Sequence, residues 1–500
     1  MEIETALLKN NFNYKMVYQE SIEATPKQSF LEIFPLNKDE TIRIVKILFE
    51  YDLQYEVVST GCNWGLGSRW SESGIVLNLQ NLNSISLNED FGVAIIDTGV
   101  TQGQLVDCLK KSGSKYYLDV TGSSRYSGIL SNALERGIAY NSQRVVSIIN
   151  MEVLLRNGKI INTSIGDSYS ELKNLYPFPT GADLKGIFFQ SEFGIVLSAS
   201  IELRKKSRYY SQIQLKFHDQ KSLLNSISVI RELIEDNVIT GIPHIANKER
   251  TWSSIIPAVS RQLGYSNKGL TKSELKLLKF LIGEFEWTGI ITIKGDKGDV
   301  KRKLKILKRA MKKYCSISIK SKNSINLLSY LVTRIDCKLF NIAKVLLEFY
   351  KYSLGESSDQ AVIGITSQPI NELTRSSIID AISKSNSGYL YSLPICENSK
   401  KKVAEMLNII NEISNRFSYH PAITLNPISK NVMEAVISIS FDKKKSDFAH
   451  EYIDKLKDSF RKKDIYLYRL SKFDKELKEI NTRNLDLLNT IVKSNQQKTQ

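Results

Sequence analysis

The chain has 500 residues, of which 42% are hydrophobic, and it carries a formal net charge of +16. A chain of this length is too long to fold around one ordinary hydrophobic core, so we expect two or three domains. No stretch approaches the roughly 18 to 20 consecutive apolar residues of a membrane-spanning helix, and the N-terminus lacks the basic and apolar pattern of a secretory signal. We therefore expect a cytoplasmic protein without a membrane partner.

The positive charge comes mostly from lysines spread through the second half of the chain. The sequence lacks the arginine clusters with interleaved aromatic residues that are typical of nucleic-acid binding, so we expect no nucleic-acid partner. Attraction of an acidic carrier protein or an anionic substrate is more consistent with this charge. The five cysteines and four histidines form no CxxC, HxH or HExxH pattern, so we expect no metal site.

The first 205 residues alternate between strand-like and helix-like segments. Short apolar runs predict strands, and amphipathic runs predict helices. The Asn-Gly pair at 157–158 marks a tight hairpin. The predicted strands are 31–34, 55–58, 74–79, 91–100, 145–155, 159–163 and 193–203, and the predicted helices are 39–51, 101–112 and 128–137.

The second half predicts an antiparallel sheet covered by helices. Strand-like segments alternate there with amphipathic segments of helical period. From about residue 448 the chain reads as helical, apart from 465–470, and the polar tail from 493 is expected to be disordered. The predicted strands are 212–217, 288–293 and 432–441, and the predicted helices are 221–234, 301–313 and 400–416.

The most informative motif is a glycine-rich loop at 59–68, directly after a predicted strand. Gly61, Gly65 and Gly67 let the backbone turn tightly and direct several N–H groups toward one point. A concave row of such donors binds a phosphate or pyrophosphate without a lysine. The loop therefore predicts a nucleotide cofactor.

Together with three later motifs, this loop resembles the FAD-linked oxidase family of the vanillyl-alcohol oxidase, p-cresol methylhydroxylase and berberine-bridge type. Residues 97–101 (DTGVT) resemble the family's strand end that leads into a helix. Residues 128–137 (GILSNALERG) are similar to the helix under the cofactor. Residues 181–196 resemble the segment whose Gly-Ile-Val end holds the adenine half. The four motifs occur in the family's order.

The resemblance implies an α+β fold and FAD as the cofactor. It implies a lead-in at 1–26, a two-lobed PCMH-type FAD-binding domain at 27–205, an antiparallel-sheet cap (substrate) domain with helices at 206–445, and a C-terminal helical segment at 446–500 that returns to the FAD domain. The residues implied to bind FAD are Thr60, Gly61, Cys62, Asn63, Trp64, Gly65, Gly67, Ser68, Val120, Gly122, Ser127, Gly128, Asn132, Glu135, Gly137, Gly194, Ile195 and Val196.

Relatives tether FAD covalently at positions that hold other residues here. These positions match Asn63, Tyr117, and either Glu434 or Ala435. We therefore expect FAD to be bound non-covalently. Arg125 lies in a helix entry that is mostly glycine in relatives, and it could either reach a phosphate or flavin oxygen or be a solvated loop residue.

Three residues are candidates for catalysis. Tyr468 and Arg469 resemble the family's pair that stabilises a phenolate and the negative charge of the flavin. The alternative is an amphipathic strand with Arg469 in solvent. Glu434 is a candidate base if it faces the flavin, and otherwise a surface carboxylate. Trp252, Trp287 and Tyr389 are further candidates for the substrate cleft.

We expect an FAD-dependent oxidoreductase, either an oxidase or a dehydrogenase. It would take a hydride from an alcohol, an alkylphenol-like compound or another activated C–H or C–OH metabolite, small or carrier-linked, and pass electrons to O2 or another acceptor. The alternatives are an aldonolactone or sugar-type oxidase and a degenerate non-catalytic scaffold. A homodimer is compatible with this expectation.

Overall fold

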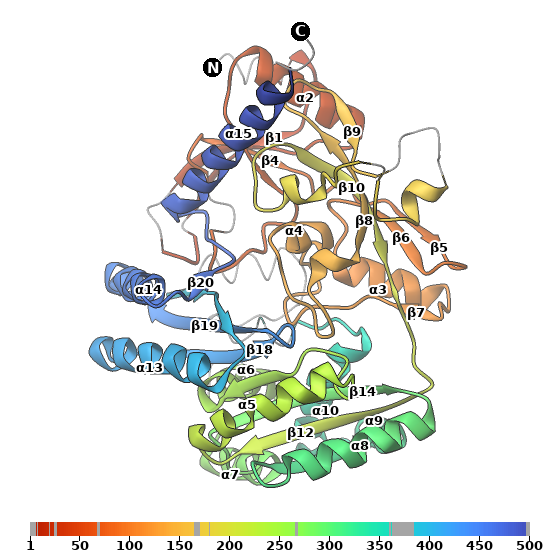
Figure 1. The fold of residues 1–500 in the computed structure, drawn as a ribbon, viewed down its shortest axis with the longest axis vertical. Coiled ribbons are helices and arrows are strands. Elements are labelled where there is room, and N and C mark those ends of the chain that lie inside the picture. Colours follow the sequence, from red (N-terminus) through yellow and green to blue (C-terminus); the bar gives the residue numbers. More distant parts are fainter. Residues whose placement is uncertain are drawn as a thin grey trace.

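The computed structural model of the chain describes residues 7, 9–19, 21–24, 28–67, 71–164, 171–179, 181–265, 269–359, 362 and 385–496. The upper lobe in Figure 1 holds two small sheets and a separate pair of short strands, and the lower lobe holds one large sheet. Helices cover the outer face of the large sheet and share one hydrophobic core with its strands. They are α5 (Gln220–Glu235), α8 (Lys297–Met311), α13 (Lys400–Phe417) and α14 (Ser446–Arg461).

The first sheet of the upper lobe contains the strand before the glycine-rich loop. Its parallel strands place the end of β3 beside the end of β4. Strand β1 lies in the predicted lead-in and pairs antiparallel with β2. The order is β1 (Tyr14–Gln19), β2 (Gln28–Ile33), β4 (Ile75–Asn78) and β3 (Glu56–Val58).

The second sheet of the upper lobe is antiparallel, and its buried strand β10 lies at the centre. Helices α3 and α4 share a hydrophobic core with it. Thr101 is the N-cap of α3 and forms a capping box with Gln104, in which the side chain of each residue accepts a hydrogen bond from the backbone N–H of the other. The order is β5 (Ile85–Asn88), β6 (Val93–Asp97), β10 (Ile195–Glu202), β8 (Ile148–Leu154) and β9 (Ile160–Asn162), while β7 (Tyr116–Tyr117) pairs separately with β11 (Arg204–Lys205).

The large sheet of the described residues is nine-stranded and antiparallel. Along β12, Ile213, Leu215 and Phe217 are fully buried against the helices, while the residues between them face the other side. The order is β15 (Ser316–Ser321), β12 (Tyr209–Phe217), β14 (Trp287–Gly295), β13 (His244–Asn247), β18 (Ala422–Pro427), β19 (Val432–Asp442), β17 (Pro394–Glu397) and β20 (Tyr466–Leu467), with β16 (Ser387–Ser392) also on β19.

The predicted helices are found with shifts of a few residues at their ends. The exception is the segment at 128–137, where α4 ends after six residues. The helices are α2 (Lys38–Glu50), α3 (Gln102–Lys111), α4 (Ile129–Leu134), α5 (Gln220–Glu235), α6 (Lys248–Gln262), α7 (Lys272–Ile282), α8 (Lys297–Met311), α9 (Lys322–Arg334), α10 (Lys338–Lys351), α13 (Lys400–Phe417), α14 (Ser446–Arg461) and α15 (Lys475–Gln496).

The C-terminal segment belongs to both lobes. Helix α14 packs on β16 and β19 of the large sheet, so this lobe extends beyond the predicted boundary near residue 445. Helix α15 lies beside the upper lobe in Figure 1, where Lys478 pairs with Glu72. It continues to Gln496, into the tail that we expected to be disordered.

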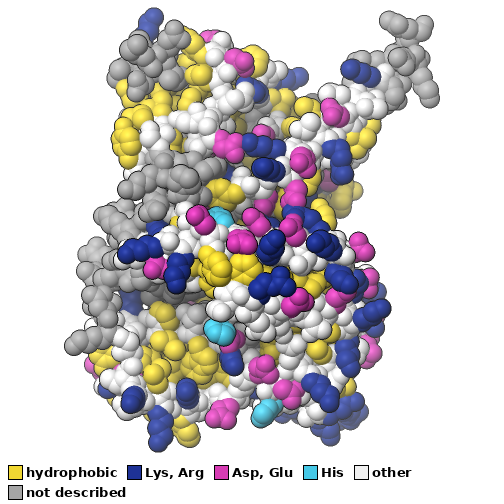
Figure 2. Space-filling model, turned by 90° about the vertical axis from the view of Figure 1, so that its left-hand side faces the viewer, with side chains coloured by type: hydrophobic (Ala, Val, Ile, Leu, Met, Phe, Trp, Pro, Cys, Tyr) yellow, Lys and Arg dark blue, Asp and Glu magenta, His cyan; other side chains and the backbone are white. Residues whose placement is uncertain are grey.

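The positive charge is distributed rather than concentrated on the face drawn in Figure 2. Lysine and arginine side chains are interleaved there with aspartate and glutamate side chains. Such a mixture does not form the single-sign stripe that draws a nucleic-acid backbone to a protein surface.

Candidate cofactor and active site

A cavity of about 450 Å³ lies where the two lobes meet. One wall is the inner face of the large sheet. Because side chains alternate along a strand, residues two positions apart on the paired strands face this space together. They are His244 and Ala246 of β13, Thr288 and Ile290 of β14, Thr424 and Asn426 of β18, and Glu434 and Val436 of β19.

The glycine-rich loop forms part of the opposite wall. Gly61, Gly65 and Gly67 have φ angles of 69°, 83° and 88°, which residues with a β-carbon rarely adopt. Among the described residues, no group accepts a hydrogen bond from the backbone N–H of Gly61, Asn63 or Trp64. Three backbone donors beside the cavity can therefore bind an anionic ligand.

The other two glycine N–H groups already have an acceptor in the protein. Those of Gly65 and Gly67 donate to Oε1 of Glu23, at 2.6 and 3.1 Å. Glu23 is fully buried and comes from the lead-in segment. Of the several N–H groups expected to face a phosphate, those at the far end of the loop are therefore held by a carboxylate of the protein.

The start of α4 lies against the loop. A β-carbon added to Gly128 would lie 2.3 Å from Oγ of Ser59, so only glycine allows this approach. Oδ1 of Asn132 is buried at the cavity and accepts no hydrogen bond from any described residue. A buried acceptor without a donor is costly unless a ligand supplies one. The donors and this acceptor fit a dinucleotide with a pyrophosphate and hydroxyl or amino groups.

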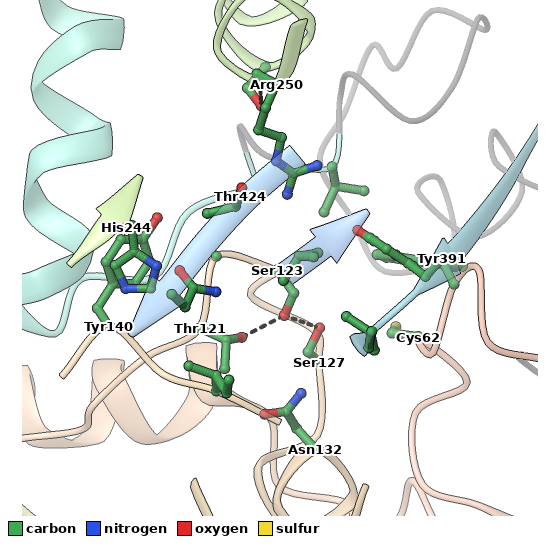
Figure 3. A pocket seen from close by; sticks show the side chains of 18 of the residues that line it. Cys62, Thr121, Ser123, Ser127, Asn132, Tyr140, His244, Arg250, Tyr391 and Thr424 are labelled. Atoms are coloured by element: carbon green, nitrogen blue, oxygen red, sulfur yellow. Dashed lines mark hydrogen bonds between the residues drawn. The ribbon is translucent and has the colours of Figure 1, made fainter. Parts of the chain in front are cut away.

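The segment between β7 and α4 presents a chain of hydroxyl groups to the cavity (Figure 3). Thr121 and Ser123 are joined by a bond of 2.8 Å, and Ser123 donates to Ser127 at 2.8 Å. Arg125 turns away from the cavity and pairs with Asp107 at 2.6 Å. These contacts favour a loop residue outside the cofactor site over one that reaches a phosphate or flavin oxygen.

Glu434 and Tyr468 meet at the cavity wall. The Tyr468 hydroxyl donates a short hydrogen bond to Oε1 of Glu434, and Asn426 donates to Oε2 at 2.7 Å. Burial raises the pKa of Glu434, although these two bonds lower it. Burial and the nearby carboxylate raise the pKa of Tyr468 well above its ordinary value. Glu434 is thus not a surface carboxylate.

Arg469 connects the C-terminal segment to the glycine-rich loop. Its Nη2 donates to Oδ1 of Asn63 at 2.8 Å. Its Nε is buried and has no acceptor among the described residues. Because both residues line the cavity, this guanidinium can still donate to a ligand there.

His244 faces the same space from β13. Its ring packs on Tyr140 with centroids 4.5 Å apart. Burial lowers the pKa of His244 to about 4, so the imidazole is neutral at physiological pH. Among the described residues, Nε2 has no hydrogen-bond partner.

Most of the residues predicted to bind FAD or to act in catalysis come together at the cavity. Ser68 lies outside the described residues. Those that line the cavity are Thr60, Gly61, Cys62, Asn63, Trp64, Gly67, Gly122, Ser127, Gly128, Asn132, Glu135, Glu434, Tyr468 and Arg469.

Six residues predicted to bind FAD are not among those that line the cavity, and their contact with FAD stays a prediction. Ile195 and Val196 begin β10, where they fill two hydrophobic cores of the upper lobe. Trp252 and Trp287 pack in cores, whereas Tyr389 lines the cavity. The six are Gly65, Val120, Gly137, Gly194, Ile195 and Val196.

The residues that sequence reasoning missed come mainly from the large sheet and α6. His244, Arg250 and Tyr391 stand in no recognisable motif, because the elements that carry them are far apart in the chain. The one available signal of these residues was the alternation of polar and apolar residues along the cap strands, with polar side chains at every second position.

Comparison with known proteins agrees with this geometry. Residues 31–164 match the family model described as an FAD binding domain. These residues therefore form an FAD-binding domain. FAD is therefore its cofactor, and the resemblance to the FAD-linked oxidases is confirmed.

Curated relatives match part of the chain. A 1'-carboxy-chondrochloren decarboxylase of Chondromyces crocatus is 34% identical over 217 residues, which are 42% of this chain and 39% of that protein. The flavoprotein subunit of the hydroxylating 4-cresol dehydrogenase of Pseudomonas putida is 25% identical over 277 residues, 54% of this chain and 53% of that protein. The match thus spans about half the length of these relatives, or less.

Solved structures extend the similarity to both lobes. A 4-ethylphenol oxidase from Gulosibacter chungangensis superposes with a TM-score of 0.74 at 18% identity, over 90% of this chain and 84% of that chain. The p-cresol methylhydroxylase structure with bound substrate gives 0.70 at 18% identity, over 88% and 81%. The predicted α+β fold, a PCMH-type domain with an antiparallel-sheet cap, is confirmed.

The described residues offer neither a membrane-spanning helix nor a cluster of metal ligands. None of their helices combines the length and the hydropathy that crossing a lipid bilayer requires. They also contain no group of three or more His, Cys, Asp or Glu side chains placed to hold a metal ion.

Proposed function

We propose that the protein is an FAD-dependent oxidoreductase that takes a hydride from a small or carrier-linked metabolite in the cavity between the two lobes. The observation that carries the proposal is the composition of this cavity. One wall holds the loop and helix start of the FAD-binding domain, and the other holds a buried carboxylate, Glu434, on the cap sheet.

Bound FAD supplies the redox chemistry, since its ring accepts the two electrons of a hydride. The N–H groups of Gly61, Asn63 and Trp64 and the side chain of Asn132 are the groups of this chain that would hold it. The tether positions of relatives match Asn63, Tyr117 and either Glu434 or Ala435, which are other residues than those that form the tethers, so we propose that FAD is bound without a covalent bond.

The chain's own residues would hold and move a proton. Glu434 accepts the proton that the substrate loses, because each of its oxygens keeps a lone pair beside the bonds from Tyr468 and Asn426. Arg469 supplies a fixed positive charge near the glycine-rich loop, where it favours negative charge that develops on a ligand.

The names of the relatives indicate a broad class of substrate. The relatives' names include a cresol dehydrogenase, a glycolate oxidase, a D-lactate dehydrogenase and a decarboxylase. We propose an alcohol, an alkylphenol-like compound or another activated C–H or C–OH metabolite, with O2 or another acceptor for the electrons. A sugar-type oxidase is the second candidate, favoured by the structural similarity to a chitooligosaccharide oxidase, with a TM-score of 0.57.

Anaerobic mixing of the holoenzyme with a panel of alcohols, alkylphenols, hydroxy acids, amines and aldoses tests the proposal. The expected result is bleaching of the flavin by at least one class, which also separates the two candidates. In the Arg469→Met variant we expect slower bleaching by the same compound. If dithionite reduces the bound flavin but no compound does, the protein is the non-catalytic scaffold rather than an enzyme.

A further inference from the structure

Arg250 is a positive charge in the cavity that neither the cofactor loops nor Glu434 uses, while Lys320, also on the wall, donates to the Tyr350 hydroxyl at 3.4 Å. Arg250 lies in the first turn of α6, one turn after the end of β13. Figure 3 shows its side chain reaching into the cavity beside Thr424, with the hydroxyl of Tyr391 pointing into the same space. The hydroxyl chain of Thr121, Ser123 and Ser127 lies opposite, on the wall of the FAD-binding domain.

The immediate partners of this guanidinium are neutral. Nη1 donates to the Tyr389 hydroxyl at 3.3 Å and to the Ser438 hydroxyl at 3.4 Å. Tyr389 in turn donates to the Tyr391 hydroxyl at 3.0 Å. Tyr391 is therefore left with its own proton to donate, and burial raises its pKa, so the hydroxyl stays protonated.

No carboxylate of the described residues lies within ion-pair distance of Arg250, although many other arginines on the molecule have one. Arginine remains charged at every physiological pH. A charge in a partly enclosed cavity is costly unless it is paired. The missing partner is then an anionic group of the ligand.

We propose that Arg250, with Tyr389 and Tyr391, binds a carboxylate group of the substrate. The inference rests on the proposed function and narrows it to metabolites that carry a carboxylic acid. The donors suit this group, because a guanidinium fork and one hydroxyl offer donors to the two oxygens of a carboxylate.

The charge of the site also favours a carboxylate over a phosphate. A single guanidinium with neutral tyrosines balances one negative charge, whereas a phosphate monoester carries nearly two. On the adjoining part of the wall, Ile255, Ile282, Leu346 and Phe349 are apolar. The substrate would therefore combine one carboxylate with an apolar portion.

Binding of matched ligands to the FAD-loaded protein tests this assignment without requiring turnover. The probes are mandelate, phenylacetate and benzoate, each compared with its neutral amide by titration calorimetry. We expect at least one acid to bind more tightly than its amide. In Arg250→Met this acid should lose about 10- to 100-fold in affinity, as expected for hydrogen bonds between charged groups, while the amide should not change.

Three variants complete the experiment. Arg250→Lys should recover part of the affinity, and Tyr391→Phe should lose a smaller part with little risk to folding. Arg261→Met removes a positive charge from the same helix outside the cavity wall, and it should leave the affinity unchanged. Equal affinity for acids and amides, or no binding of any acid, would overturn the assignment.

Two further outcomes separate this inference from the proposed function. If Arg250→Met weakens the binding of FAD and not of the acid, the guanidinium serves the cofactor and the assignment is wrong. If an acid binds through Arg250 but no compound of any class bleaches the flavin, the anion site stands and the oxidoreductase proposal fails.

Discussion

Glu434 illustrates how much the surroundings of one side chain decide about its chemistry. Only 1% of it is exposed, and both of its oxygens accept hydrogen bonds from neighbours on β18 and the C-terminal segment. Burial favours the protonated form, so its pKa is raised. A carboxyl group with a raised pKa is better suited to exchange a proton near neutral pH than one in water.

This raised pKa gives a prediction with a defined sign. As a base, Glu434 must be deprotonated, so the rate of flavin reduction should rise with pH through a midpoint above the ordinary glutamate value of about 4.3. In Glu434→Gln we expect a rate about 10²- to 10⁴-fold lower and without this rise. Stopped-flow absorbance at several pH values measures both.

Glu397→Gln on the neighbouring strand β17 is the control, because that carboxylate is exposed. It should keep the pH profile of the unmodified protein. A profile that stays the same in Glu434→Gln would remove Glu434 from the proton transfer.

At the scale of single elements, the glycine-rich loop is fixed by both its own conformation and the cap. Gly65 has a φ of +83°, and a β-carbon added to it would lie 2.5 Å from the ring of Tyr391. Gly74 has a similar φ of +78° but nothing within 4 Å of such an atom. A comparison of substitutions at Gly65 and Gly74 therefore distinguishes the cost of backbone strain from the cost of a clash with the cap.

We predict that Gly74→Ala costs only the strain of the left-handed conformation, about 1–2 kcal/mol. Gly65→Ala should cost a further 1–3 kcal/mol or so, because the new methyl group must displace Tyr391. Thermal unfolding of the two holoenzymes measures the difference. Equal losses of stability would mean that the loop does not contact the cap as described.

The elements of the FAD-binding domain could be predicted from the sequence because their requirements are local. A glycine with positive φ, an Asn-Gly hairpin and the Thr101 cap each depend on a few neighbouring residues. The cap side of the cavity could not be predicted in this way. Arg250 and Tyr389 are 139 residues apart. They meet only because α6 packs on β13 and β18 of the large sheet, to which β16 with Tyr389 also belongs.

The lead-in segment shows the same limit. Nothing around Glu23 indicates that its carboxylate will accept hydrogen bonds from Gly65 and Gly67, 42 and 44 residues later. The backbone carbonyl of Glu23 also has a distant partner, because it is hydrogen-bonded to Nε2 of His450 in α14, 427 residues later. Such contacts follow from tertiary packing and not from a local pattern.

At the scale of the whole molecule, the two lobes are joined around the cavity by polar contacts as well as by packing. Lys294 of β14 donates to Tyr117 at 2.8 Å and to Asn141 at 3.0 Å, both of the upper lobe. Arg469 makes a second link, to Asn63 of the loop. These links hold the wall that binds the cofactor against the wall that carries Glu434 and Arg250.

We propose that this cavity holds FAD without a covalent bond, between the glycine-rich loop and the cap sheet. The most direct measurement is the absorbance of the purified protein, before and after acid precipitation. The purified protein should be yellow, its flavin should pass entirely into the supernatant, and the refolded protein should take up FAD again. A protein that stays colourless in the presence of excess FAD, or a precipitate that keeps its colour, would contradict this proposal.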